Sequence, residues 1–95
     1  MLSFASCLKV FIALDAVDMR AGVNALAALV AEKLKEDVRG GALFVFTNRR
    51  RKLIKVLYFD GTGTWLMSKR LESGTFFWPR AAQEGQGKLE LRWRK

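Results

Sequence analysis

The chain has 95 residues, a formal net charge of +8, one cysteine and no histidine. This length fits a single domain, which we place over residues 1–95, with a modest hydrophobic core. Hydrophobic residues make up 51% of the chain, which indicates a folded protein. The lone cysteine excludes an internal disulfide framework, and the lack of histidine excludes histidine-based triads and histidine metal sites.

The positive charge lies in the second half of the chain. Residues 1–46 hold five cations and five anions, whereas residues 47–95 hold twelve cations and four anions. A one-sided basic excess is typical of nucleic-acid binders, although charge that merely confers solubility is the simpler alternative. No window reaches 18 apolar residues, so we expect no membrane contact and a cytoplasmic protein.

The first half predicts a strand followed by a helix. Leu8 to Leu14 is rich in β-branched and aromatic residues, as strands are. We expect one substantial helix from about Asp18 to Glu36, with Asp18 as its N-cap and Gly40-Gly41 as its stop signal. The helix would present one apolar face, formed by Val23, Leu26, Ala27, Val30 and Leu34.

The second half predicts closely spaced strands at residues 43–47, 53–59, 64–71 and 88–95, the last on a sheet edge. Asp60-Gly61 is a hairpin signal, and we interpret the polar stretch from Arg80 to Lys88 as a mobile loop. The fold class is therefore α+β, with one helix packed on a mostly antiparallel sheet in the order strand, helix, meander.

Four consecutive cations, Arg49 to Lys52, fall on the turn between the strands at 43–47 and 53–59. Arginines on such a turn can reach DNA phosphates, and Lys55, Lys69 and Arg70 would extend the patch. A merely solvated turn is the alternative. Two tryptophans, Trp65 and Trp78, are candidates either for stacking on unpaired bases or for packing in the core.

Candidate catalytic groups are few. Asp15, Asp18 and Asp60 lie near predicted strand ends, but Asp18 is explained as a helix cap and Asp60 as a turn residue, so the three make a weak site. No base lies near Cys7 in the sequence. The glycines of GGALF and DGTGTW do not fit a phosphate-cradling motif. We therefore expect no enzymatic activity, no metal and no cofactor.

Four blocks of the sequence together resemble one protein family. They are DMR at residues 18–20, GALFVFTNRRR at 41–51, IKVLYFDGTG at 54–63 and KRLESGTFFWP at 69–79. The family is the small accessory protein, TnpB or Orf2-like, encoded by the second reading frame of IS66-type bacterial insertion sequences. It is unrelated to the RNA-guided nuclease that shares the TnpB label.

The resemblance implies a non-catalytic accessory role in DNA transposition, beside a separate transposase that carries the catalytic residues. It also implies that a short leucine-rich helical segment follows LELRWRK in the family. It supports a role shared by five residues, which are Asn48, Arg49, Arg50, Lys69 and Arg70. The expected nucleic-acid contacts are thus Asn48, Arg49, Arg50, Arg51, Lys52, Lys55, Lys69 and Arg70. The alternative is a subunit that docks on the transposase without touching DNA; self-association stays open.

Overall fold

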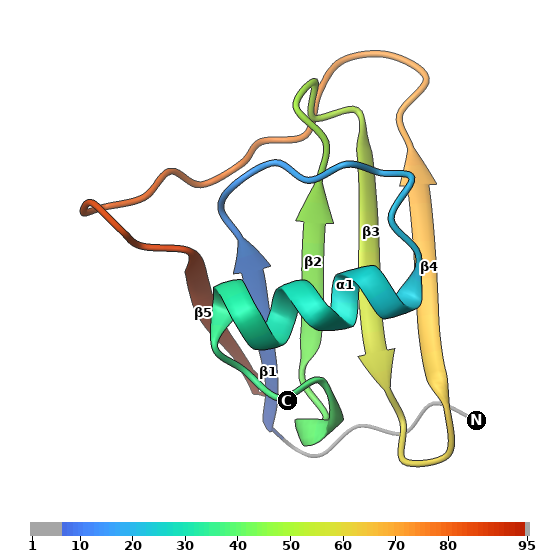
Figure 1. The fold of residues 1–95 in the computed structure, drawn as a ribbon. Coiled ribbons are helices and arrows are strands. Elements are labelled where there is room, and N and C mark those ends of the chain that lie inside the picture. Colours follow the sequence, from blue (N-terminus) through green and yellow to red (C-terminus); the bar gives the residue numbers. More distant parts are fainter. Residues whose placement is uncertain (1–6, 95) are drawn as a thin grey trace.

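The computed structural model describes residues 7–94 and shows one sheet with helical segments packed against it (Figure 1). The α-helix α1 (Val23–Leu29) continues directly as the π-helical segment η1 (Val30–Leu34), and a short 3-10 segment, η2 (Val38–Gly40), follows. The strands are β1 (Cys7–Ala13), β2 (Leu43–Thr47), β3 (Leu53–Phe59), β4 (Thr64–Arg70) and β5 (Lys88–Arg94). Among the described residues, no helix has the length and apolar character needed to cross a membrane.

The sheet has the strand order β4-β3-β2-β1-β5. Strands β1 and β2 are parallel, joined by a crossover through the helix, and every other neighbouring pair is antiparallel. Strands β2, β3 and β4 form the expected meander, while β5 returns to pair with β1 at the opposite edge. The predicted α+β class, the mostly antiparallel sheet and the edge position of the last strand are confirmed.

The core lies between the helix and one face of the sheet. Leu26, Val30 and Leu34, four residues apart, are almost fully buried, with exposed fractions of 0%, 0% and 3%. They belong to one hydrophobic cluster with Phe44 and three other aromatic or aliphatic strand residues, Phe11, Phe46 and Leu57. Each such side chain contributes about 1.5–3 kcal/mol on burial, so this interface fixes the helix on the sheet.

The predicted start of the helix is wrong. The helix begins at Val23, after an N-cap at Gly22, because residues 14–22 first cross the end of the sheet (Figure 1). The carboxylate of Asp18 caps a two-residue turn instead, accepting a 2.9 Å hydrogen bond from the backbone N–H of Arg20. Val17 N–H donates to the Thr47 carbonyl at 2.9 Å, which ties this crossing segment to the sheet.

The predicted end of the helix, near Glu36, lies within two residues of the observed end, but Gly40-Gly41 is not its stop signal. The helix stops at Leu34, and Lys35 takes a left-handed conformation with φ of 56°. The ammonium of Lys88, on β5, donates to the Leu34 carbonyl at 2.6 Å and pairs with the Glu36 carboxylate. A partner distant in sequence therefore satisfies a carbonyl that the helix leaves free at its end.

Trp65 and Met67 lie on the sheet face away from the helix. Strand alternation and the register place Val45 and Val56 on this face too. Trp65 is 44% exposed and Met67 38% exposed. The core-packing alternative for Trp65 is therefore wrong, whereas Trp78 is half-buried and donates from its indole N–H to the Ala13 carbonyl at 2.9 Å.

Candidate nucleic-acid interface

The four cations lie on a turn whose shape is set by Asn48. The Asn48 side-chain oxygen accepts hydrogen bonds from the backbone N–H groups of Lys52 at 3.1 Å and Leu53 at 3.3 Å. The Arg51 N–H donates to the Asn48 carbonyl at 3.0 Å, and Arg51 itself takes a left-handed conformation with φ of 55°. We call residues 48–52 the basic turn. Asn48 therefore has a structural role, which positions the cations beside it.

All four cationic side chains of the basic turn are exposed. Within residues 7–94, no hydrogen bond or ion pair joins the Arg49, Arg50, Arg51 or Lys52 side chain to another group, so their charges face solvent uncompensated. Four like charges on one turn repel each other in this arrangement. Such a turn gains electrostatically from an anionic partner outside the chain.

A neighbouring segment fixes the basic turn from the side. The Leu71 N–H donates to the Lys52 carbonyl at 2.8 Å, and the Phe76 N–H donates to the Arg51 carbonyl at 2.7 Å. The first of these bonds continues the pairing of β3 with β4, in which Arg70 lies opposite Leu53 and Lys69 opposite Ile54. Lys69 and Arg70 therefore extend the basic turn at the same end of the sheet.

Lys55 is placed differently from the other predicted contacts. It is half-buried on the helix-facing side of β3, and its ammonium donates to the carbonyls of Met19 at 2.7 Å and Ala21 at 3.1 Å. This side chain holds the segment that leads into α1. Its hydrogen-bond donors are largely used inside the protein, so we do not include Lys55 in the surface described below.

Arg80, in the stretch that the sequence predicts to be a loop, lies close to the basic turn. A cleft of ≈ 280 Å³ is lined by Arg49 and Arg51 on one side and by Trp78 and Arg80 on the other. Arg80 is exposed and, in the described part of the chain, has no ion pair. Two long-range hydrogen bonds, Phe76 N–H to the Arg51 carbonyl and Trp78 Nε1–H to the Ala13 carbonyl, hold the segment before Arg80 here, and no local sequence pattern signals them.

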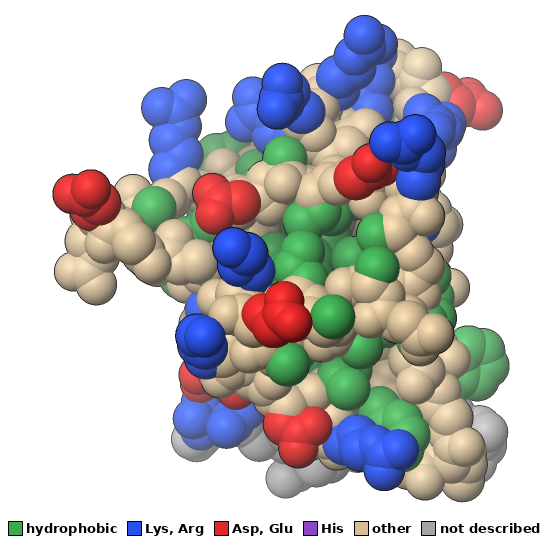
Figure 2. Space-filling view, viewed as in Figure 1, with side chains coloured by type: hydrophobic (Ala, Val, Ile, Leu, Met, Phe, Trp, Pro, Cys, Tyr) green, Lys and Arg blue, Asp and Glu red, His purple; other side chains and the backbone are tan. Residues whose placement is uncertain are grey.

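Seven cations thus gather at one end of the sheet, and we call them the basic end. The basic end comprises Arg49, Arg50, Arg51, Lys52, Lys69, Arg70 and Arg80. Figure 2 shows Lys and Arg side chains gathered where the basic turn lies in Figure 1. Two carboxylates, Asp15 and Glu72, belong to the same end, so a net positive charge remains.

The remaining aspartates have structural partners. Asp18 forms a 2.8 Å ion pair with Arg20, and hydrogen bonds from Arg20 lower the pKa of its carboxyl to about 2. Asp60 closes the turn between β3 and β4, as predicted: one oxygen accepts from Thr62 and Gly63 N–H at 2.9 Å, and the other from Trp65 Nε1 at 2.8 Å. These hydrogen bonds hold the pKa of the Asp60 carboxyl well below its usual value, and the bond from the Thr62 backbone N–H has the largest effect.

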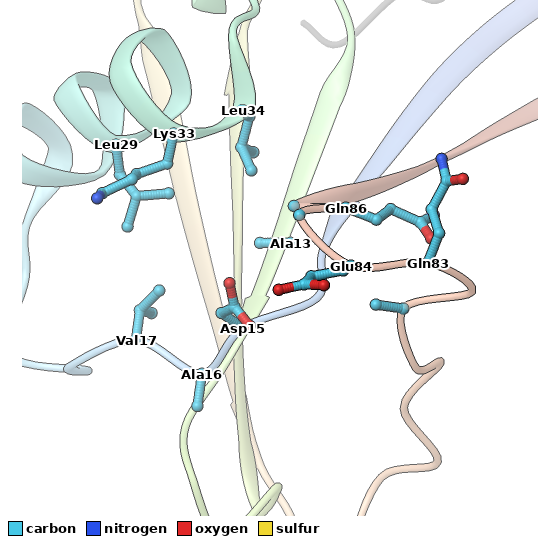
Figure 3. A pocket seen from close by; sticks show the side chains of 13 residues that line it. Ala13, Asp15, Ala16, Val17, Leu29, Lys33, Leu34, Gln83, Glu84 and Gln86 are labelled. Carbon is cyan, nitrogen blue, oxygen red and sulfur yellow. The ribbon is translucent and has the colours of Figure 1, made fainter.

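A second cavity, of ≈ 500 Å³, lies beside the basic end, between the helix and residues 81–87. Asp15 and Glu84 come from two separate loops and Lys33 from the helix (Figure 3). Two carboxylates with one lysine are a weak set for a metal ion. Within residues 7–94, no group of three or more His, Cys, Asp or Glu residues could hold one.

Comparisons with known proteins agree with the sequence resemblance. The family model described as IS66 Orf2 like protein matches residues 8–95. Two Sinorhizobium fredii proteins, the uncharacterized proteins y4hO and y4jC, are 47% and 42% identical over 73 and 72 residues. These alignments cover 77% and 76% of this chain but 64% and 62% of the relatives, so the chain spans less than two thirds of their length. No solved structure matches. The chain belongs to the IS66 Orf2-like family.

Proposed function

We propose that this protein is a non-catalytic accessory factor for transposition of an insertion sequence and that it binds DNA through the basic end. The family supports the association with transposition. The observation that carries the DNA-binding part is the gathering of seven cations, none with an ion pair among the described residues, at one end of a rigid sheet. Action on chromosomal DNA would place the protein in the bacterial cytoplasm.

The proposed contact is to the phosphate backbone rather than to base edges. The basic turn joins β2 and β3, and Lys69 and Arg70 lie one strand further, so the cations extend over roughly 10 Å at the usual strand spacing. A duplex carries one phosphate charge per about 1.7 Å of its axis, so several phosphates face a surface of that width. Binding of this kind depends strongly on salt and weakly on sequence.

A non-catalytic role fits the placement of the carboxylates. Asp18 and Asp60 accept hydrogen bonds that shape turns, and they lie in different turns of the fold. Two-metal nuclease chemistry needs carboxylates that converge on one pair of ions. We therefore propose that the chemistry of transposition belongs to a separate transposase and that this chain assists it.

The second candidate is a subunit that docks on the transposase without touching DNA. The same uncompensated arginines favour it, because acidic side chains of a protein partner would satisfy them as phosphates do. A gel-shift experiment with the purified protein alone at moderate salt separates the two. A shifted DNA band supports direct binding, whereas an unshifted band, with the fold intact, favours docking on a protein partner.

A further inference from the structure

The cleft beside the basic turn has the size and lining of a site for a small anionic ligand. Its volume is ≈ 280 Å³, close to the lower limit of small-molecule sites and too small for a base pair with both its backbones. Arg49, Arg51 and Arg80 contribute three positive charges, and Asp15 contributes the single negative charge. An elongated ligand matches this combination if it carries a phosphate and a ring that has apolar faces and polar groups at its edge.

We infer that this cleft binds one unpaired nucleotide of the DNA, an inference that rests on the proposed DNA binding and makes it more specific. The phosphate would lie against the three arginines. The base would lie toward Asp15 and Trp78, because a carboxylate repels phosphate but accepts hydrogen bonds from base amino groups. The remaining cations of the basic end would contact phosphates of the flanking duplex.

The walls of the cleft are fixed before any ligand arrives. On one side, the Asn48 side chain and the Phe76 N–H hold the basic turn through hydrogen bonds of 2.7 to 3.3 Å. On the other side, Trp78 is held by its hydrogen bond to the Ala13 carbonyl. That bond occupies the indole N–H, so what Trp78 can still offer a base is the ring itself. Preformed walls lower the ordering cost of binding.

The test compares three labelled DNA probes by fluorescence anisotropy at fixed salt: a paired duplex, the same duplex with one bulged cytosine, and the same duplex with one bulged abasic site. The abasic bulge keeps the extra sugar and phosphate of the bulge but presents no base. We expect the cytosine bulge to bind roughly 5- to 150-fold more tightly than the other two, the range of base–aromatic stacking.

Two charge variants localise the effect. Arg80→Gln removes a cation that lines the cleft, and it should reduce the preference for the cytosine bulge more than it reduces binding to the paired duplex. Arg39→Gln is the matched control, because Arg39 is also exposed but lies over the Phe59 ring at the opposite end of the sheet. It should change the three affinities equally and slightly.

The outcomes separate this inference from the function on which it rests. If all three probes bind equally well and with the same salt dependence, the nucleotide site is refuted, whereas DNA binding by the basic end stands. An unchanged bulge preference in folded Arg80→Gln protein would also refute the placement in this cleft. If no probe binds, the DNA-binding proposal fails and the inference falls with it.

Discussion

Removing the three arginines of the basic turn should weaken DNA binding for all sequences alike. If each cation of the basic end neutralises one phosphate, seven contacts give a log–log salt slope of about −6.3 and the affinity falls about 6,000-fold between 50 and 200 mM salt. With Arg49, Arg50 and Arg51 replaced by Gln, four contacts remain. The slope becomes about −3.6 and the loss over the same interval about 150-fold. Anisotropy on one duplex at several salt concentrations measures both slopes.

The fold should survive this triple replacement. The three side chains are exposed and their mutual repulsion is relieved, so the free energy of unfolding should change by less than about 1 kcal/mol. Thermal unfolding followed by circular dichroism checks this, and Arg39→Gln serves as the charge control for DNA binding. An unchanged slope and affinity in the folded triple variant would refute DNA binding by the basic turn. The basic turn would then be assigned to binding a protein partner.

Three further predictions concern the scaffold. Asn48→Ala leaves the Lys52 and Leu53 N–H groups without their partner and should cost about 1–3 kcal/mol in urea unfolding; a loss no larger than that of a surface substitution would contradict the turn assignment. Leu26→Ala opens a cavity under the helix and should cost about 2–5 kcal/mol in the same assay, and a smaller loss would mean that the helix is not fixed by this contact. Because the Asp60 pKa is lowered by folding, its contribution is present above the unfolded pKa of about 3.9 and is lost as pH falls below it. Asp60→Asn should flatten that acid-side decline in stability, and an unchanged pH profile would contradict the role of Asp60.

The sheet could be predicted from the sequence because its strands are local apolar runs. Leu43–Thr47 and Leu53–Phe59 match the observed bounds, and turn signals delimit both runs. The first strand is shifted by one residue at each end, β4 ends one residue earlier than predicted, and β5 begins at the predicted Lys88, while its predicted end at residue 95 lies outside the described residues. Strand type and length follow from composition within each run, which the sequence carries directly.

The start of the helix and the contact that ends it could not be predicted, because they involve partners distant in sequence. Asp18 has the chemistry of an N-cap, but its carboxylate binds Arg20, and Lys55 holds the backbone just before the helix. Lys88 likewise binds the helix end from β5. Local propensity identified the apolar face correctly, and tertiary hydrogen bonds determined where the helix begins and stops.

Part of the candidate site could likewise be predicted from the sequence, and part could not. The run Arg49 to Lys52 and its position on a turn are visible in the sequence, and so is the adjacent pair Lys69 and Arg70. The placement of two residues could be seen only in the structure. Lys55 alternates onto the helix-facing side of β3 and is bonded there, and the segment before Arg80 is held beside the basic turn by the long-range bonds of Phe76 to Arg51 and of Trp78 to Ala13.

The central claim, direct DNA binding by this chain, is tested most directly by one titration. Purified wild-type protein, without transposase, is titrated into a labelled duplex at several salt concentrations. We expect binding at moderate salt, with little sequence dependence and a log–log slope of several units that reflects the phosphates contacted by the basic end. No detectable binding at low salt by folded protein would contradict it.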